Sequence, residues 1–337
     1  MATPGVFTCA ELLEITAMAE QMWADSTLSN DYVAHIESAR AVLSEQTVQM
    51  APLSDPAKDN KIKLEWIEMC DLTPVDCNTA CDFSGGDEAG ATCVEYEITG
   101  CKEVRFTIKD GVFRTSMFSK EEVTAKAFVK AMKALDEHIA KSSISAIDSF
   151  VGTNGFTGGI GTVVGTNTTI PAALMNADAF AYLVHTAILN QINNPYLLSG
   201  SNFFETNWIA EANSGRPNEA GNVAKLNTFR KYFDLFNLDA LVGKKSYLID
   251  KGAVAIVHKA FYGESPVPMG LGSPKIRWSV PSANLPNVRY DVYYEALCVD
   301  RDNTEHAYTM VARHNTLQNP VNSCTATQTG VLSFECV

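Results

Sequence analysis

The longest uninterrupted amphipathic pattern in the chain runs over residues 119–150. Ser119 is followed three positions later by Glu122, the spacing of a capping box, in which the two side chains satisfy free backbone N–H groups at the start of a helix. Apolar residues then recur at helical spacing, and no Gly or Pro interrupts them. The apolar stripe consists of Val123, Phe128, Met132, Leu135, Ile139 and Ala146. The pattern predicts a helix of roughly 40 Å with one face on a sheet and its acid pairs, such as Asp136-Glu137, in solvent.

Two shorter helical patterns precede this helix. The first opens on a capping box of Thr8 and Glu11 and extends to about Asp25, and the second covers about 31–44. Neither helix is long enough to form a core of its own. We therefore expect an N-terminal arm, residues 1–60, whose apolar faces dock on the main domain or on another subunit.

From residue 61 the hydrophobic period changes to two. Ile62, Leu64 and Trp66 alternate with polar residues, and similar alternation returns at 94–98 and 104–108. Because an isolated hairpin is only marginally stable in water, this extended β-hairpin loop, residues 61–118, needs a partner for its apolar face.

After the long helix, residues 152–165 are rich in glycine but lack the spacing of a dinucleotide or phosphate loop, which favours a flexible connector. Helices are predicted at 176–192 and 223–236, and a strand-like run at 246–257 ends in an apolar segment typical of a central strand. These elements predict a small inserted α/β domain.

The chain closes with extended segments at 275–280, 288–300 and 306–313. Their alternating side chains predict strands that form the sheet beneath the long helix. The fold class is therefore α+β, with a chain that leaves a platform, builds a second domain and returns.

Charge narrows the function. The 337 residues include 26 Lys and Arg against 39 Asp and Glu, for a net charge of −13. Proteins that bind nucleic acid through charge need clustered Lys and Arg side chains, so electrostatic binding to DNA is not expected. The first basic residue is Arg40 and no apolar run approaches the roughly 18 residues of a membrane span, so we expect no secretory signal and no membrane association.

Five of the nine cysteines fall within a short stretch: Cys70, Cys77, Cys81, Cys93 and Cys101. Packed free thiols, disulfides formed outside the reducing cell and a metal site all remain open, because the spacing is looser than that of paired zinc knuckles and no histidine lies within the stretch. This is the one candidate disulfide or metal cluster.

The sequence singles out no catalytic, cofactor-binding or other metal-binding residue. The six histidines are scattered outside any metal-ligand spacing, and no nucleophile elbow or protease-like cysteine signature occurs. We expect a chain that is not an enzyme and needs no cofactor, although a triad can assemble from distant residues.

The order of these elements resembles the major capsid protein of tailed bacteriophages, the HK97-like fold. In that family the parts are the N-terminal arm, the extended loop, a peripheral domain with its spine helix and long strands, and an axial domain. The resemblance assigns them to 1–60, to 61–118, to 119–152 with 275–337, and to 153–274, respectively.

The resemblance implies a structural shell subunit that self-assembles through pentamers and hexamers into the icosahedral capsid of a tailed phage. Such a shell encloses double-stranded DNA without sequence-specific binding, contacts a portal and other capsid proteins, is assembled in the host cytoplasm and becomes part of the virion. Some members crosslink subunits through a Lys–Asn bond, whose partners we cannot place in this sequence. Two alternatives stay open: an encapsulin-like compartment that encloses cargo protein, and an α/β enzyme with a site built from distant residues.

Overall fold

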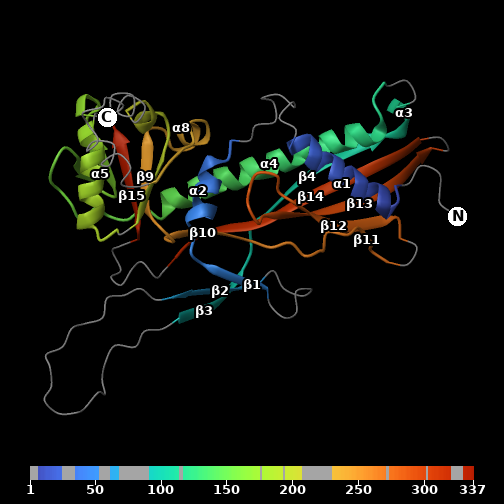
Figure 1. Cartoon of the computed structure of the whole chain (residues 1–337), viewed down its shortest axis with the longest axis horizontal. Helices are drawn as coiled ribbons and strands as arrows, with labels where there is room; N and C mark the ends of the chain where they lie inside the picture. The colour runs from blue at the N-terminus through green and yellow to red at the C-terminus, as the bar shows by residue number, and fades with distance from the viewer. Residues whose placement is uncertain are drawn as a thin grey trace, which may run out of the picture.

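The computed structural model describes residues 7–24, 35–52, 61–67, 91–113, 117–174, 177–192, 194–206, 230–270, 273–300, 303–319 and 329–337. These residues form an elongated α+β body with a long sheet, a small sheet at one end and a third sheet below (Figure 1). Within these ranges, no helix combines the length and apolar character that crossing a membrane requires.

The long sheet, here called the platform, contains the three predicted C-terminal strands. They are β12 (Lys275–Pro281), β13 (Arg289–Asp300) and β14 (Asn303–Gln318), all antiparallel. β4 (Cys101–Lys109) and β10 (Val254–His258) also pair with β14, and β11 (Val267–Pro268) pairs with β12. Trp278, Val292, Met310 and Val104 form one cross-strand row. Such rows give the platform its apolar face toward the long helix.

The long helix is α4 (Lys120–Ser149), 30 residues, and its capping box is present. Ser119 Oγ accepts from Glu122 N at 3.1 Å, and Glu122 Oε2 accepts from Ser119 N at 3.2 Å. The helix buries a wider face than its predicted stripe, since Ala125, Val129 and Ile144 are also inaccessible to solvent. The cause is that the platform contacts one side of α4 while α1, α2 and α8 pack on the others (Figure 1).

The N-terminal arm docks on its own chain. α1 (Cys9–Ala24) follows the predicted Thr8–Glu11 capping box and buries Leu12 and Ile15 in the platform core. α2 (Glu37–Glu45) is shorter than predicted, because residues 35–36 are not helical. Glu45 Oε1 accepts from Arg230 and from the Tyr232 hydroxyl, both at 2.7 Å. The arm therefore ties the platform to the small sheet.

The predicted hairpin is β2 (Lys61–Ile67) and β3 (Ala91–Glu97), which β1 (Gln49–Pro52) extends to a three-stranded sheet below the platform (Figure 1). Ile62, Leu64 and Ile98 pack with Val257 of β10. The described part of the hairpin thus finds its apolar partner within the same chain. After β4, the short α3 (Asp110–Phe113) precedes α4.

The small sheet has the strand order β5-β6-β15-β9-β7-β8. Its strands are β5 (Thr162–Val164), β6 (Asn167–Ile170), β7 (Pro195–Ser199), β8 (Arg230–Phe233), β9 (Lys245–Asp250) and β15 (Val331–Cys336). Its helices include η2 (Ala172–Leu174), α5 (Ala177–Leu189) and α8 (Asn237–Val242), and residues 201–206 are helical as well. β10 pairs with β14 in the platform, and β15 pairs with β6 and β9 in the small sheet. The sequence of a strand does not specify its pairing partner, so neither pairing was predicted.

Three local predictions are wrong. Residues 230–233 belong to the strand β8 rather than to a helix, since parallel pairing with β7 and the edge-on contact of Tyr232 with Tyr196 at 5.9 Å outweigh the helical spacing of the aromatics. β10 pairs only with β14 in the described chain, so it is not a central strand, although both of its faces are buried. The glycine-rich connector is packed rather than free: Asn190 donates to Asn154 and accepts from Gly155 N, both at 2.9 Å.

Candidate functional site

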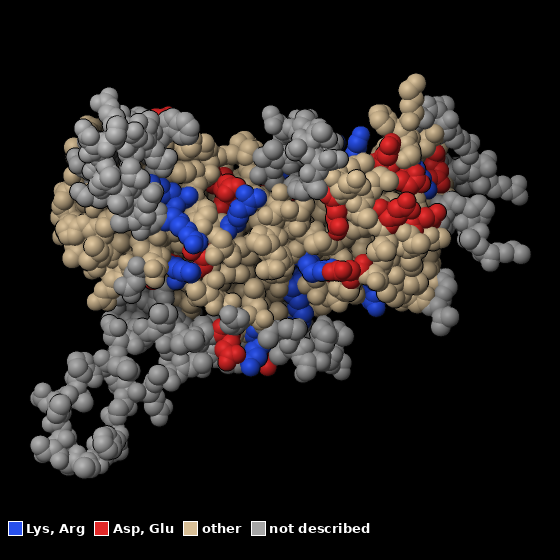
Figure 2. Space-filling model, in the orientation of Figure 1, with Lys and Arg blue, Asp and Glu red and all other residues tan. Residues whose placement is uncertain are grey.

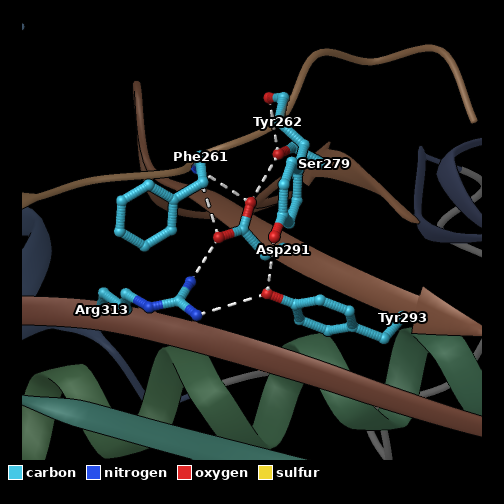
Figure 3. A network of polar contacts seen from close by, with 6 residues as sticks. All are labelled: Phe261, Tyr262, Ser279, Asp291, Tyr293 and Arg313. Carbon is cyan, nitrogen blue, oxygen red and sulfur yellow. Dashed lines mark hydrogen bonds and ion pairs between the residues drawn. The ribbon is translucent and has the colours of Figure 1, made fainter. Parts of the chain in front are cut away.

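A buried polar network lies on the platform face that points away from α4, at Asp291 of β13 (Figure 3). The carboxylate is buried and accepts from Phe261 N at 3.0 Å, from the Ser279 hydroxyl at 2.8 Å and from the Arg313 guanidinium. Alternation along β12, β13 and β14 places Ser279, Asp291 and Arg313 on one face. The charge of Asp291 is thus balanced by the cation of the adjoining strand.

Aromatic rings enclose this ion pair. The Arg313 guanidinium lies 4.5 Å from the centre of the Phe261 ring and donates to the Tyr293 hydroxyl at 3.4 Å. Tyr293 and Tyr262 share a hydrogen bond of 3.2 Å, and burial raises the pKa of Tyr293 to about 12. Phe261 N donates to Asp291 and Tyr262 O accepts from the Ser279 hydroxyl, so the network fastens the segment at Phe261–Tyr262 to the sheet.

A second buried carboxylate, Asp136, lies on the opposite face, between α4 and the platform. Sequence analysis placed this residue in solvent, but its exposure is 0%. It accepts from the Ser282 hydroxyl at 2.7 Å, from the Asn284 amide at 3.1 Å and from the Tyr290 hydroxyl. Burial raises the pKa of Asp136, and these three donors oppose the rise. The partners lie about 150 positions away, and no local pattern could have indicated them.

A third cluster assembles Asp110, His306 and Tyr294 from distant parts of the chain, the arrangement that the enzyme alternative requires. His306 Nε2 lies 3.1 Å from Asp110 Oδ1, and its Nδ1 lies 2.9 Å from the Tyr294 hydroxyl. Phe7 N also donates to that hydroxyl, at 3.2 Å, and Lys120 forms an ion pair with Asp110 at 2.7 Å.

The imidazole and the tyrosine hydroxyl of this third cluster are closed to solvent, whereas the Asp110 side chain is 26% exposed. His306 and Tyr294 are 0% and 1% exposed, and the Phe7 ring packs 4.9 Å from the His306 ring. Burial raises the pKa of Tyr294 to about 12 and, with Lys120 as the second cause, lowers that of His306. A neutral imidazole between a tyrosine hydroxyl and a carboxylate holds the arm on the platform, and its geometry supports a structural role.

Three further histidines, His138, His258 and His314, meet at the root of the hairpin, although sequence analysis found them scattered. His258 and His314 are register partners in β10 and β14, and the His138 ring lies 5.6 Å from that of His314. Cross-strand register is the information that the sequence lacks. In the described chain, no three His, Cys, Asp or Glu side chains are placed to hold a metal ion.

The predicted cysteine cluster is only partly described. Cys101 opens β4 and is an exposed free thiol, and Cys93 lies in β3 opposite Glu65. Cys70, Cys77 and Cys81, like the side chain of Cys93, lie outside the described residues. Their chemistry stays a prediction.

Charge is unevenly spread over the face in Figure 2. Acidic side chains gather toward the end with α1, a helix that exposes Glu11, Glu14 and Glu20 and contains no Lys or Arg (Figure 2). Lys and Arg stand in small groups closer to the small sheet (Figure 2). The described residues of this face thus lack the continuous basic surface that binding to phosphates requires.

No protein-family model matches the sequence, and no curated protein matches it. Among solved structures, the chain is similar to a chain of Mycobacterium phage Che8, with 16% identity, a TM-score of 0.40, and 86% of this chain and 92% of that chain covered. It is similar to a chain in the capsid structure of the cyanophage P-SCSP1u, with 10% identity, a TM-score of 0.45 and coverage of 83% and 84%. It is also similar to a chain of the virus-like particle from Pyrococcus furiosus, with 9% identity, a TM-score of 0.46 and coverage of 96% and 100%.

Proposed function

We propose that this chain is a structural subunit of a protein shell, the icosahedral capsid of a tailed phage that encloses double-stranded DNA. The observation that carries the proposal is the arrangement of four parts in one chain (Figure 1). A 30-residue helix lies along a sheet of long strands, a small sheet stands at one end, a helical arm runs across both, and a hairpin sheet extends below. The order of elements along the sequence supports the same proposal.

The described polar clusters support a mechanical role. Each is buried and joins segments that are far apart in sequence: Asp291 with Phe261, Asp136 with Ser282, and His306 with Asp110. Such contacts stiffen a subunit and offer no open site for a substrate. The acidic surface suits a container whose cargo is held by enclosure rather than by attraction to phosphates.

The finer assignments belong to the same proposal. The platform with α4 would form the peripheral part of the subunit, the small sheet the axial part, and the hairpin the extended loop that lies over a neighbour. Subunits would assemble into pentamers and hexamers in the host cytoplasm, with a portal and other capsid proteins, and end in the virion. The subunit would need no cofactor and perform no catalysis.

Electron microscopy of the purified chain tests the proposal. We expect closed shells of uniform size, or rings of five and six subunits, with a matching high-mass peak in size-exclusion chromatography. A monomer or dimer that persists at high concentration and in a crowding polymer would contradict it and favour the enzyme alternative. Closed particles that contain co-purifying protein rather than DNA when isolated from their natural source would select the encapsulin-like compartment.

Reinforcement through Cys70, Cys77, Cys81, Cys93 and Cys101, by disulfides or a metal, stays a prediction of the same proposal. The exposed thiol of Cys101 is available to such chemistry. Particles should show covalent oligomers in non-reducing electrophoresis that disappear with reductant, and monomer alone would rule out disulfides between subunits. Zinc measured in chelator-washed particles tests the metal version.

A further inference from the structure

Two histidines face each other where the hairpin joins the platform. His258 and His314 are register partners, and Lys259 N donates to Arg313 O at 3.1 Å, which makes the adjoining pair the hydrogen-bonded one. His258 and His314 are therefore a non-hydrogen-bonded pair, with Cα atoms about 4.5 Å apart and side chains close together. The ring of His138 on α4 lies 5.6 Å from that of His314.

The hydrogen bonds fix the proton on each ring of this pair. The Ser142 hydroxyl donates to Ile139 O at 2.9 Å, so it accepts from His314 Nε2 at 2.8 Å. The carbonyl oxygen of Asn287 can only accept, so His258 Nε2 donates to it at 2.6 Å. Each Nδ1 atom is then unprotonated and carries a lone pair, and both atoms are buried without a hydrogen-bond partner among the described residues. A second proton on either ring would have no acceptor.

The groups around the rings also oppose a positive charge. Lys102 of β4 and Lys141 of α4 act on His138, and burial with these two cations lowers the pKa of His138. Burial, followed by the neighbouring rings of His138 and His258, lowers the pKa of His314 to about 4, and burial lowers that of His258. Two carboxyl groups lie on the same stretch of α4: Asp136 is turned to Ser282, Asn284 and Tyr290, and Glu137 forms an ion pair with Lys133 at 3.9 Å.

The same residues hold the root of the hairpin. His314 N donates to the carbonyl oxygen of Gly100, the residue before β4, at 3.1 Å, and Gly100 N donates to Asn315 Oδ1 at 2.6 Å. A Cβ atom at Gly100 would collide with the carbonyl oxygen of His314, so only glycine allows this approach. Asn315 Nδ2 further donates to the hydroxyls of Tyr96 and Thr99, at 2.9 and 3.1 Å. Any shift of His314 therefore moves the attachment of the hairpin.

We propose that His138, His258 and His314 form an acid-sensitive joint, whose protonation releases the root of the hairpin from β14. In the released state the rings meet water and bind protons with ordinary affinity, whereas in the closed state they do not. Opening is then independent of pH above about 6.5 and increases as the pH falls from there toward 4. Each proton taken up raises the opening equilibrium by up to about tenfold per pH unit. The joint goes beyond the shell proposal and does not depend on it.

Hydrogen exchange on the full-length chain tests the joint. Between pH 6.5 and 5, protection factors of peptides that contain Gly100 and His314 should fall by up to about tenfold per pH unit for each proton taken up, once the intrinsic pH dependence of exchange is removed. Peptides from α5 should keep their protection. Constant protection at Gly100 and His314 over this range would overturn the proposal.

Variants separate the charge from the fold. His314→Gln keeps an N–H donor for Ser142 but cannot be protonated, so it should flatten the pH dependence, and His258→Gln should do the same if the first variant does not fold. The matched control is His185→Gln, an exposed ring on α5, which should leave the slope unchanged. An unchanged slope in a folded His314→Gln or His258→Gln variant would also overturn the proposal.

Discussion

Asp136 and Asp291 are buried on opposite faces of the same sheet, and they are stabilised in different ways. Asp291 has a cationic partner, Arg313, together with two neutral donors. Among the described residues, the donors to Asp136 are neutral, from Ser282, Asn284 and Tyr290, and burial raises its pKa. A buried carboxylate can thus be stabilised by an opposite charge or by several neutral hydrogen-bond donors.

The two solutions belong to two kinds of packing. On the α4 face the carboxylate projects from the helix itself and meets the turn with Ser282 and Asn284. On the other face the adjoining strand β14 supplies Arg313, two positions beyond Val311, the register partner of Asp291. The ion pair with Arg313 holds the Asp291 side chain in place, whereas burial raises the pKa of Asp136. The comparison leads to four predictions, from the largest effect to the smallest.

Leu135→Asp places a carboxylate one residue from Asp136 without any of its donors. Leu135 is fully buried, so the free energy of unfolding should fall by more than about 4 kcal/mol and the chain should fail to fold or assemble. Thermal denaturation and particle yield measure this loss. The control is Ala134→Asp on the exposed side of the same helical turn, which should cost less than about 1 kcal/mol. Normal particles from Leu135→Asp would show that the buried face of α4 is assigned wrongly.

Arg313→Met removes the cation and leaves Asp291 buried and charged. The expected loss is about 3–5 kcal/mol in chemical denaturation, since breaking one side of a buried pair leaves an uncompensated charge. Adding Asp291→Asn to this variant should recover part of the loss. Equal stabilities of the single and double variants would mean that Arg313 acts through its stacking on Phe261 rather than through charge.

Tyr290→Phe removes one of the three donors of Asp136 and changes little else. We expect a loss of about 1–3 kcal/mol in urea denaturation, because one acceptor of a buried group becomes unsatisfied. Tyr293→Phe, on the opposite face, is the matched control and should cost less, as Tyr293 donates nothing to Asp291 in this structure.

Asp136→Asn should change how the free energy of unfolding depends on pH more than it changes the magnitude of that free energy. A carboxyl group with a raised pKa favours the folded state at low pH, and this contribution is lost as the pH rises through its folded-state pKa. As the pH rises from 4 to 7, the free energy of unfolding of the variant should therefore increase relative to that of the parent chain, by at most about 1.4 kcal/mol per pH unit. Parallel stability curves of the two proteins would contradict the raised pKa.

The sequence predicted those elements whose signals are local. The capping boxes at Ser119 and Thr8, the stripe of α4 and the alternation in β12, β13 and β14 each lie within a few neighbouring residues. The strand at 230–233 was missed because its aromatic spacing fits a helix as well, and only its pairing with β7 decides between them.

The buried clusters could not be predicted for a related reason. Asp136 reads as a surface acid on an amphipathic helix until the turn at 282–290 is laid against it. His258 and His314 are separated by 56 positions and become neighbours only through the register of β10 with β14. The sequence contains the residues of such a cluster, but the register between strands determines which of them become neighbours.

One hydrogen bond at the edge strand β10 of the platform limits how another chain can pair with the sheet. Ile256 in β10 directs its backbone N–H away from β14, and the side-chain amide of Gln46 accepts this bond at 3.0 Å. An open strand margin invites another chain to add to the sheet, and repeated addition yields fibres rather than closed particles. At this position, the Gln46 side chain from the arm occupies the place that a foreign strand would take, which opposes the addition of another strand at Ile256.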